Sequence, residues 1–422
     1  MKLIRKAISA LIVFVLIMML AACGSSGSSS GDSNGKKTLT VSVDSSNAAY
    51  ATFVNSIKGK FEKQNNVTVK IVKKPMFDQL TALTLDGPAG KAPDVMLAPY
   101  DRVGALGQQG QLLAVDKSML NFLNEKGQRQ VQVGKKYYGV PLTVEALVMF
   151  YNKDLVKKAP TTFKDLEALA KDKRFAFSSE QGKNTGFLMK WTDFYYAYGL
   201  YAGYGGYVFG KNGTNAKDIG LNNAGSVQAV TYATHWFQKV WPKGMQDVKA
   251  SGNFVTNEFV KGKAGAVVDG PWQAATYKKA KVNYGVAKIP TLPNGQEYKP
   301  FAGGKSWVAS AYTKNPSLAK KWMTYATNET NAYKFYKDSN EIPINPQAQN
   351  KVNASNDVLS KAVISQYDSS VPMPSIPEMA EVWTTMEPAM FNAASGKKTP
   401  KQTLDDAVSS LHKTIEQKYK DK

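Results

Sequence analysis

Residues 38–71 read TLTVSVDSSNAAYATFVNSIKGKFEKQNNVTVKI, and this stretch indicates the fold. Apolar residues alternate over 38–43 and again over 67–71, which is the two-residue period of a half-buried strand. Between these two runs, apolar residues recur at the four-residue spacing of the inner face of a helix: Phe53, Ile57 and Phe61. A strand, a helix and a second strand in this order predict an α/β lobe with a mainly parallel sheet.

The rest of the chain carries further signals of an α/β protein. The Thr162 hydroxyl can cap a helix together with Asp165, one turn further on. Short apolar runs predict buried strands, and apolar residues at helical spacing predict helices. We expect strands over 94–98, 264–268 and 307–309, and helices over 78–85, from Thr162 onward, over 318–338 and over 404–419.

Three extended segments suggest crossings between two lobes. They lie at 143–147, 290–300 and 343–346. The 385 residues after position 37 (422 − 37) exceed the size at which single cores stop growing, so two lobes are expected. Three crossings make each lobe discontinuous. The expected segments are 38–143 plus 300–345 for the N-terminal lobe, and 144–299 plus 346–422 for the C-terminal lobe.

The first 37 residues differ in composition from the rest. A positively charged start, an apolar segment over 7–19 and the run Leu20–Cys23 have the layout of a secretory signal. The run resembles a bacterial lipobox, which implies that 1–22 is a cleaved signal peptide and that Cys23, the only cysteine, carries the lipid. Residues 23–37 would then be a lipidated Ser/Gly tether. We expect an exported protein, lipid-anchored at the extracellular face of the cell membrane. An ordinary signal peptide with an accidental cysteine is the alternative.

Composition excludes several classes of function. The formal net charge is +21, but the lysines are scattered and the protein is exported, so attraction to anionic lipids and wall polymers is expected, and nucleic acid is not. The two histidines, His235 and His412, have no second plausible ligand nearby, so we expect no metal, no cofactor and no Ser/His/Asp triad. Seven Trp and 21 Tyr are many for this length, and part of that aromatic surface is expected to face a ligand.

Several short strings follow one another over most of the mature chain. They are FEK at 61–63, APDV at 92–95, DR at 101–102, VEAL at 144–147, YNKDL at 151–155, GGY at 205–207, DGPW at 269–272, KVNYGV at 281–286, KPF at 299–301, PSIP at 374–377 with Trp383, and NAASG at 392–396. In this order they resemble the strings of the maltose/maltodextrin-binding proteins of ABC importers. The resemblance implies a two-lobed periplasmic-binding-protein-like fold whose hinge closes the lobes around a maltodextrin. It also implies a non-catalytic monomer that delivers the sugar to ABC transporter permease subunits.

The resemblance also implies a set of sugar-binding residues. Carboxylates and a guanidinium suit the polar rim of a sugar ring, and aromatic planes suit its C–H faces. In the first lobe, Asp101 and Arg102 match a pair that bonds sugar hydroxyls, and Glu145 matches a carboxylate beside the hinge. The matches in the second lobe are Asp193, where the family usually has glutamate, and three stacking residues, Tyr195, Trp272 and Trp383.

Three departures from the family pattern leave the preferred saccharide open. Ala98 stands where many members carry a cleft tryptophan, and Glu387 stands where an arginine is common. The loop over 44–50 has no lysine. The sequence therefore sets neither the length and linkage of the sugar nor whether the segment Ser45–Tyr50 contacts it.

Each assignment has a structural alternative. The Asp–Arg pair would otherwise be a surface ion pair, Glu145 a solvated hinge residue, and the two tryptophans core residues, while a neighbouring tyrosine would replace Tyr195. Two other functions also stay open. One is binding of a different oligosaccharide. The other is hydrolysis by a cell-surface glycosidase that uses Glu145, Asp193 and Asp269 as acid and nucleophile.

Overall fold

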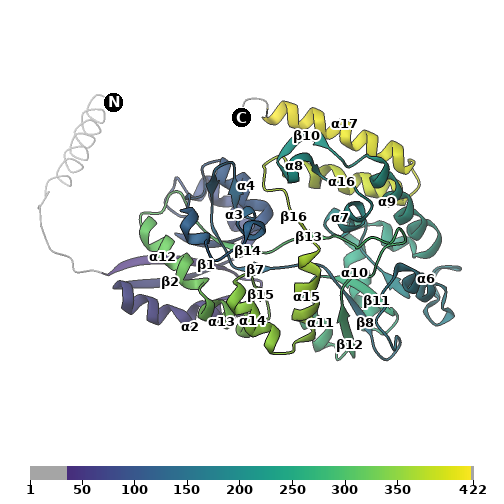
Figure 1. The fold of residues 1–422 in the computed structure, drawn as a ribbon, viewed down its shortest axis with the longest axis horizontal. Coiled ribbons are helices and arrows are strands. Elements are labelled where there is room, and N and C mark those ends of the chain that lie inside the picture. Colours follow the sequence, from purple (N-terminus) through teal and green to yellow (C-terminus); the bar gives the residue numbers. More distant parts are fainter. Residues whose placement is uncertain (1–35, 420–422) are drawn as a thin grey trace, which may run out of the picture. The chain divides into compact units, whose positions relative to one another are not determined.

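The computed structural model describes residues 36–419 (Figure 1). The predicted signal peptide over 1–22, the predicted lipid anchor Cys23 and nearly all of the predicted tether over 23–37 lie outside the described residues. Contacts divide the chain after Lys37, and the chain from Thr38 onward forms one compact unit. Within 36–419, no helix has the length and apolar character needed to cross a membrane.

The described residues contain both strands and helices throughout. The strands are β1 Lys37–Asp44, β2 Val67–Lys74, β3 Val95–Pro99, β4 Gln132–Val133, β5 Lys136–Tyr137, β6 Val140–Pro141, β7 Thr143–Val144, β8 Val148–Asn152, β9 Phe187–Leu188, β10 Asn215–Ile219, β11 Ala266–Asp269, β12 Tyr284–Ala287, β13 Phe301–Ala302, β14 Lys305–Ala309, β15 Ile342–Pro343 and β16 Val371–Pro372. The α-helices are α2 Ala48–Asn65, α3 Met76–Asp86, α4 Tyr100–Gln108, α5 Glu125–Arg129, α6 Phe163–Lys171, α7 Phe194–Gly203, α8 Gly210–Gly213, α9 Ala224–His235, α10 Val248–Val260, α11 Ala274–Lys279, α12 Pro316–Ala326, α13 Glu329–Ser339, α14 Pro346–Ala354, α15 Val358–Asp368, α16 Met379–Ala394 and α17 Pro400–Tyr419.

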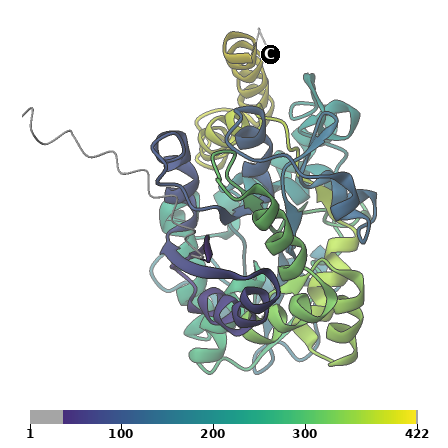
Figure 2. The ribbon, with the colours of Figure 1, turned by 90° about the vertical axis from the view of Figure 1, so that its left-hand side faces the viewer.

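The first sheet has five strands in the order β2-β1-β3-β14-β6. The expected strand–helix–strand unit is present as β1, α2 and β2, and Phe53, Ile57 and Phe61 of α2 are buried. β1 and β3 are parallel, whereas β14 runs antiparallel to both β3 and β6. The sheet is therefore less parallel than the sequence suggests. The reason is that β14 follows the extended segment over 290–300, not a crossover helix, and so its direction is not fixed as in a β-α-β unit. Helices α12 and α13, in green, pack beside α2, in purple (Figures 1 and 2).

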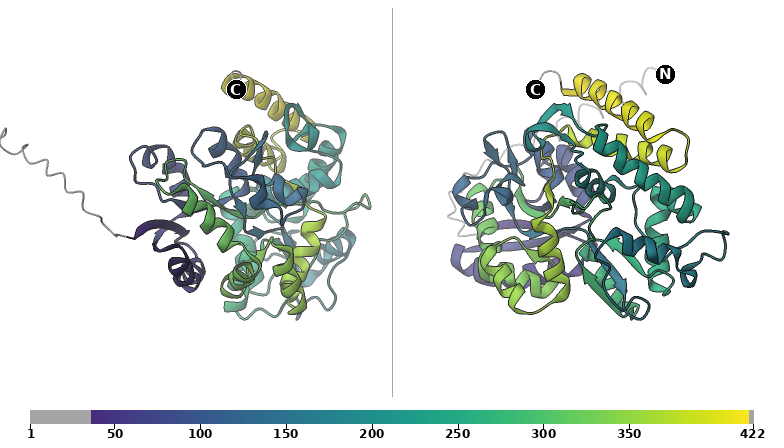
Figure 3. Two further views of the ribbon diagram at one scale, coloured as in Figure 1. Left: turned by 60° about the vertical axis from the view of Figure 1, so that its left-hand side comes forward. Right: turned by 45° about the vertical axis from the view of Figure 1, so that its right-hand side comes forward.

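The second sheet has four strands in the order β12-β8-β11-β9. β8 is antiparallel to both β11 and β12, and β11 is parallel to β9. Helix α15 packs against β12 and β8, and α10 packs against β11. The last two helices, α16 and α17, lie side by side and pack against α9 (Figures 1 and 3).

Three strand contacts occur near the predicted crossings. β7 pairs antiparallel with β15, β13 pairs parallel with β16, and Glu145 forms an antiparallel bridge with Gly303. Helix α14 packs against α13 and β15, whereas α15 packs against β12. The exact lobe boundaries at 143, 300 and 345 stay a prediction.

Local capping explains where two helices begin. Asp165 donates its N–H to Thr162 Oγ1 at 3.2 Å, and Thr162 donates its own N–H to Asp165 Oδ2 at 2.9 Å, so the predicted cap is confirmed. The single helix expected over 318–338 is wrong. It is two helices, α12 and α13, because the Asn328 side chain accepts the N–H of Asn331 at 2.9 Å and starts a new helix.

Candidate ligand-binding site

A pocket of about 430 Å³ brings together all seven residues predicted to bind sugar. They come from the chain near β3, β7, α7, β11 and α16, which are far apart in the sequence. The pocket is lined by the predicted residues Asp101, Arg102, Glu145, Asp193, Tyr195, Trp272 and Trp383, and also by Phe77, Pro99, Tyr100, Gly303, Gly304, Met373 and Glu387.

Asp101 and Arg102 lie in the first turn of α4, immediately after β3 ends at Pro99. Arg102 Nε lies 3.3 Å from Asp101 Oδ2, and the Arg102 guanidinium lies 5.6 Å from the centre of the Phe77 ring. Burial raises the pKa of the Asp101 carboxyl, and Arg102 partly offsets that rise. The Arg102 side chain is 47% exposed, so its remaining N–H groups are accessible to a ligand. The two residues form an ion pair, and this pair lies in the pocket wall.

Glu145 comes directly after β7 and lies beside Gly303, which comes directly after β13. Its N–H donates to the Gly303 carbonyl at 2.9 Å, and its carbonyl accepts the Gly303 N–H at 2.9 Å. The carboxylate is 13% exposed and forms an ion pair with Lys305, whose Nζ also lies 3.0 Å from Glu341 Oε2. Burial raises the pKa of Glu145, and Lys305 opposes the rise. Glu145 is therefore not a solvated hinge residue.

Asp193 starts helix α7 by accepting the N–H of Tyr195 at 2.9 Å. Burial raises the pKa of the Asp193 carboxyl to about 6, against the lowering effect of that hydrogen bond and of Lys190. Glu387, which lines the same pocket, raises it further. The Tyr195 ring lies 6.4 Å from the Trp272 ring, centre to centre.

Neighbouring tyrosines of α7 have other partners. Tyr196 donates its hydroxyl to Asp269 Oδ1 at 2.7 Å, and Tyr198 stacks on Phe301 with ring centres 3.7 Å apart. Neither is among the residues that line the pocket. Asp269 is fully buried, and Lys190 Nζ lies 3.0 Å from its Oδ2. This carboxylate therefore forms a structural ion pair.

The tryptophans separate into two groups by burial. Trp191, Trp236, Trp241, Trp307 and Trp322 are at most 1% exposed. Trp272 is 47% exposed and Trp383 is half-buried, and these are the two in the pocket.

The two pocket tryptophans have different supports. The Trp272 ring lies over Gly270, where an added Cβ would come within 2.1 Å of the indole. The absence of a side chain at Gly270 therefore lets this ring lie against the backbone. Trp383 packs edge-on against Phe194 and Phe301, with ring centres 5.9 Å and 5.8 Å away.

Several pocket residues were missed from the sequence. Phe77 is 52% exposed and lies off the buried stripe of α3 formed by Met76, Leu80 and Leu83. A large aromatic outside a helix's apolar stripe was a usable signal. No comparable local signal marks Met373, whose place in the pocket depends on long-range packing. Ala98 is fully buried and is not among the pocket residues, whereas Glu387 is.

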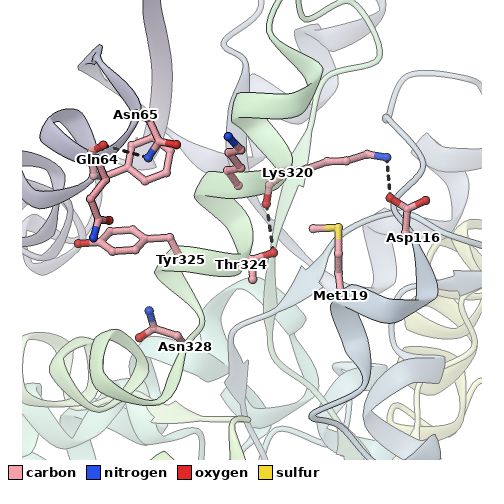
Figure 4. Close-up of a pocket in the computed structure, with 10 residues that line it drawn as sticks. Gln64, Asn65, Asp116, Met119, Lys320, Thr324, Tyr325 and Asn328 are labelled. Carbon is pink, nitrogen blue, oxygen red and sulfur yellow. Dashed lines mark hydrogen bonds and ion pairs between the residues drawn. The ribbon is translucent and has the colours of Figure 1, made fainter.

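A second pocket, of about 450 Å³, lies between α2 and α12 (Figure 4). The Lys320 side chain extends toward Asp116, and its Nζ lies 3.0 Å from Asp116 Oδ2 (Figure 4). In this pocket, the Tyr325 hydroxyl donates to the Ile57 carbonyl at 2.9 Å. It holds none of the seven predicted residues and no exposed aromatic pair.

Comparison with known proteins places the chain in a family. Residues 57–362 match the family described as bacterial extracellular solute-binding protein. The chain belongs to this family. The maltodextrin-binding protein MdxE of Bacillus subtilis is 58% identical over 419 residues, which are 99% of this chain and 100% of that protein.

Two solved structures are similar over nearly their whole length. The maltose-binding protein MalE of Listeria monocytogenes in complex with maltose has a TM-score of 0.86 and 60% identity, covering 91% of this chain and 99% of that one. MalX of Streptococcus pneumoniae in complex with maltopentaose has a TM-score of 0.84 and 45% identity, covering 89% and 100%. The two-lobed α/β solute-binding fold predicted from the sequence is confirmed.

Proposed function

We propose that this chain is the substrate-binding lipoprotein of an ABC importer for maltodextrins. It captures the sugar in the pocket lined by Glu145 and Trp272 and delivers it to permease subunits at the extracellular face of the membrane. Cys23 carries the lipid. The similarity to proteins named as maltodextrin-binding supports the sugar class, and the extracellular family supports the location.

One observation carries the proposal: the pocket combines carboxylate acceptors, a guanidinium and aromatic faces. Asp101, Glu145 and Asp193 supply carboxylate acceptors, and Arg102 supplies several donors in a fixed fork. The aromatic residues Tyr195, Trp272 and Trp383 supply planar faces. A sugar ring has a rim of hydroxyls and apolar C–H faces, and this set of groups complements both.

The test is calorimetric titration of the unlipidated chain from residue 24, which keeps every described element, with α-linked and β-linked glucose oligomers. Maltotriose should bind with one site per chain, and cellotriose should bind far more weakly. Binding of neither would contradict the sugar class. Tighter binding of cellotriose would favour a different oligosaccharide.

We also propose that the pocket binds without catalysis. Of the three carboxylates considered for glycosidase chemistry, Asp269 is buried in its pair with Lys190, and Glu145 is held by Lys305. Asp193 caps α7. Prolonged incubation with maltotriose should release no new reducing ends. Product that disappears in Glu145→Gln would instead support hydrolysis.

A further inference from the structure

Two carboxylates lie close together at the crossing strands. Ile342 of β15 pairs with Val144 of β7 in antiparallel register, which places Glu341 opposite Glu145, one residue beyond the ladder. Like charges directly opposite one another destabilise a strand pair. The two carboxylates are 13% and 16% exposed, so water screens their repulsion poorly. A cation between the two carboxylates would offset this repulsion.

Lys305 supplies that cation from a third strand. It is the first residue of β14, its Nζ contacts Glu145 Oε1, and the same nitrogen lies 3.0 Å from Glu341 Oε2. Tyr50 donates its hydroxyl to the other oxygen of Glu341. Glu145 lines the pocket, whereas Lys305 and Glu341 are not among the lining residues. One buried ammonium therefore connects a pocket carboxylate to Glu341, which precedes β15 and is not among the pocket residues.

We propose that Lys305 is a positioning residue for sugar binding, which holds Glu145 ionised, oriented toward the pocket and tied to Glu341, the residue before β15. The inference rests on the proposed function, in which Glu145 accepts a sugar hydroxyl. An ionised carboxylate accepts a shorter and stronger hydrogen bond than a neutral one. Without the ammonium, a buried carboxyl beside another carboxylate takes up a proton and loses acceptor strength.

The charges around Glu145 agree with this role. Burial opposes the positive charge of Lys305, yet Glu145 and Glu341 together raise the Lys305 pKa well above its ordinary value, so the amine stays charged. Burial dominates at Glu145 and raises the pKa of that carboxyl, so its ionisation depends on the neighbouring cation. The titratable groups that act on Glu145 or are acted on by it are Lys305, Glu341, Asp101, Tyr50, Tyr100 and Tyr195.

The test compares a double variant with a single one. In the wild type, Lys305, Glu145 and Glu341 together carry a formal charge of −1 (+1 − 2). The double variant Lys305→Met with Glu341→Gln keeps that charge at −1, from Glu145 alone, but removes the cation beside Glu145. Glu341→Gln alone keeps the Lys305–Glu145 pair and serves as the control. Maltotriose affinity is measured by calorimetry from pH 7 to pH 9, above the pKa of about 6 at Asp193.

The wild type and the control should bind with nearly constant affinity over this range. The double variant should bind more weakly at pH 7 than at pH 9, because burial without a neighbouring cation raises the pKa of the Glu145 carboxyl and leaves less of it ionised at the lower pH. Lys305→Arg, which keeps the charge, should restore the flat profile. An unchanged affinity in the double variant, or a loss equal at every pH, would overturn the positioning role, because a purely structural lesion does not follow pH.

A ligand-free measurement separates this inference from the proposed function. If the wild type binds no maltotriose, the function fails, but the state of Glu145 is still observable by infrared spectroscopy. At pH 7 the double variant should show a protonated-carboxyl band that is lost when Glu145→Gln is added. Identical spectra for the double and triple variants would show that Glu145 stays ionised without Lys305, and the inference would be wrong.

Discussion

Replacing Trp272 by alanine is expected to weaken maltotriose binding while leaving the ligand-free fold almost unchanged. A tryptophan side chain offers about 150–250 Å² for burial, and 47% of Trp272 is exposed. A ligand that covers this face removes roughly 100 Å² from water, which contributes about 2.5 kcal/mol at ~25 cal/mol per Å². The expected loss on substitution is therefore between about tenfold and a hundredfold in Kd.

Two measurements separate a ligand platform from a core residue. Calorimetry with maltotriose gives the change in Kd, and thermal unfolding without sugar gives the change in stability. Trp191→Ala is the matched control, because Trp191 is fully buried and should cost about 3 to 5 kcal/mol of folding free energy. Trp383→Ala should lower the folding stability by more than Trp272→Ala and by less than Trp191→Ala, because Trp383 is half-buried against Phe194 and Phe301.

The reasoning for Trp272 would be refuted by the opposite pattern. A variant with a melting temperature lowered as far as that of Trp191→Ala, and with unchanged affinity in its folded fraction, would mean that the exposed indole face does not meet the sugar. A second check is indole fluorescence. Maltotriose should change the emission of the wild type, and Trp272→Ala should show a smaller change.

Four other outcomes are expected. Gly270→Ala should displace the Trp272 ring and raise the Kd, and an unchanged Kd would contradict the contact described at Gly270. Burial raises the pKa of Asp193 to about 6, so the carboxylate is lost as pH falls through 6; the Kd should rise from pH 7 to pH 5, and less steeply in Asp193→Asn. Cys23→Ala should leave an uncleaved or mis-sorted precursor on fractionation, and normal membrane-bound mature protein would contradict the anchor. Saturating maltotriose should reduce the radius of gyration in small-angle scattering, whereas tight binding at constant radius would place the whole site on one lobe.

Local patterns predicted most of the fold. The buried face of α2 and the cap at Thr162 follow from spacing and hydrogen-bonding capacity within a few residues, so they were accessible from the sequence. The break at Asn328 was not, because an asparagine inside a helical pattern can either face solvent or start a new helix. The direction of β14 was also missed, since it depends on a return from a distant part of the chain.

In the pocket, too, residues of the lining could be predicted from the sequence, whereas a residue that supports them could not. Asp101, Arg102, Glu145 and Trp272 lie in short strings that can be recognised one at a time, and the structure brings them and the other three predicted residues to one pocket. The contact between Glu145 and Lys305 joins residues that are 160 positions apart in the sequence, so no local pattern predicts it. Their meeting depends on β7, β14 and β15 converging at the crossings. A comparison restricted to the lining residues would treat Glu145 as equivalent in any chain that has it. With a different residue at position 305, the same glutamate would face Glu341 without a cation, and its charge, and with it its strength as a sugar acceptor, would differ at neutral pH.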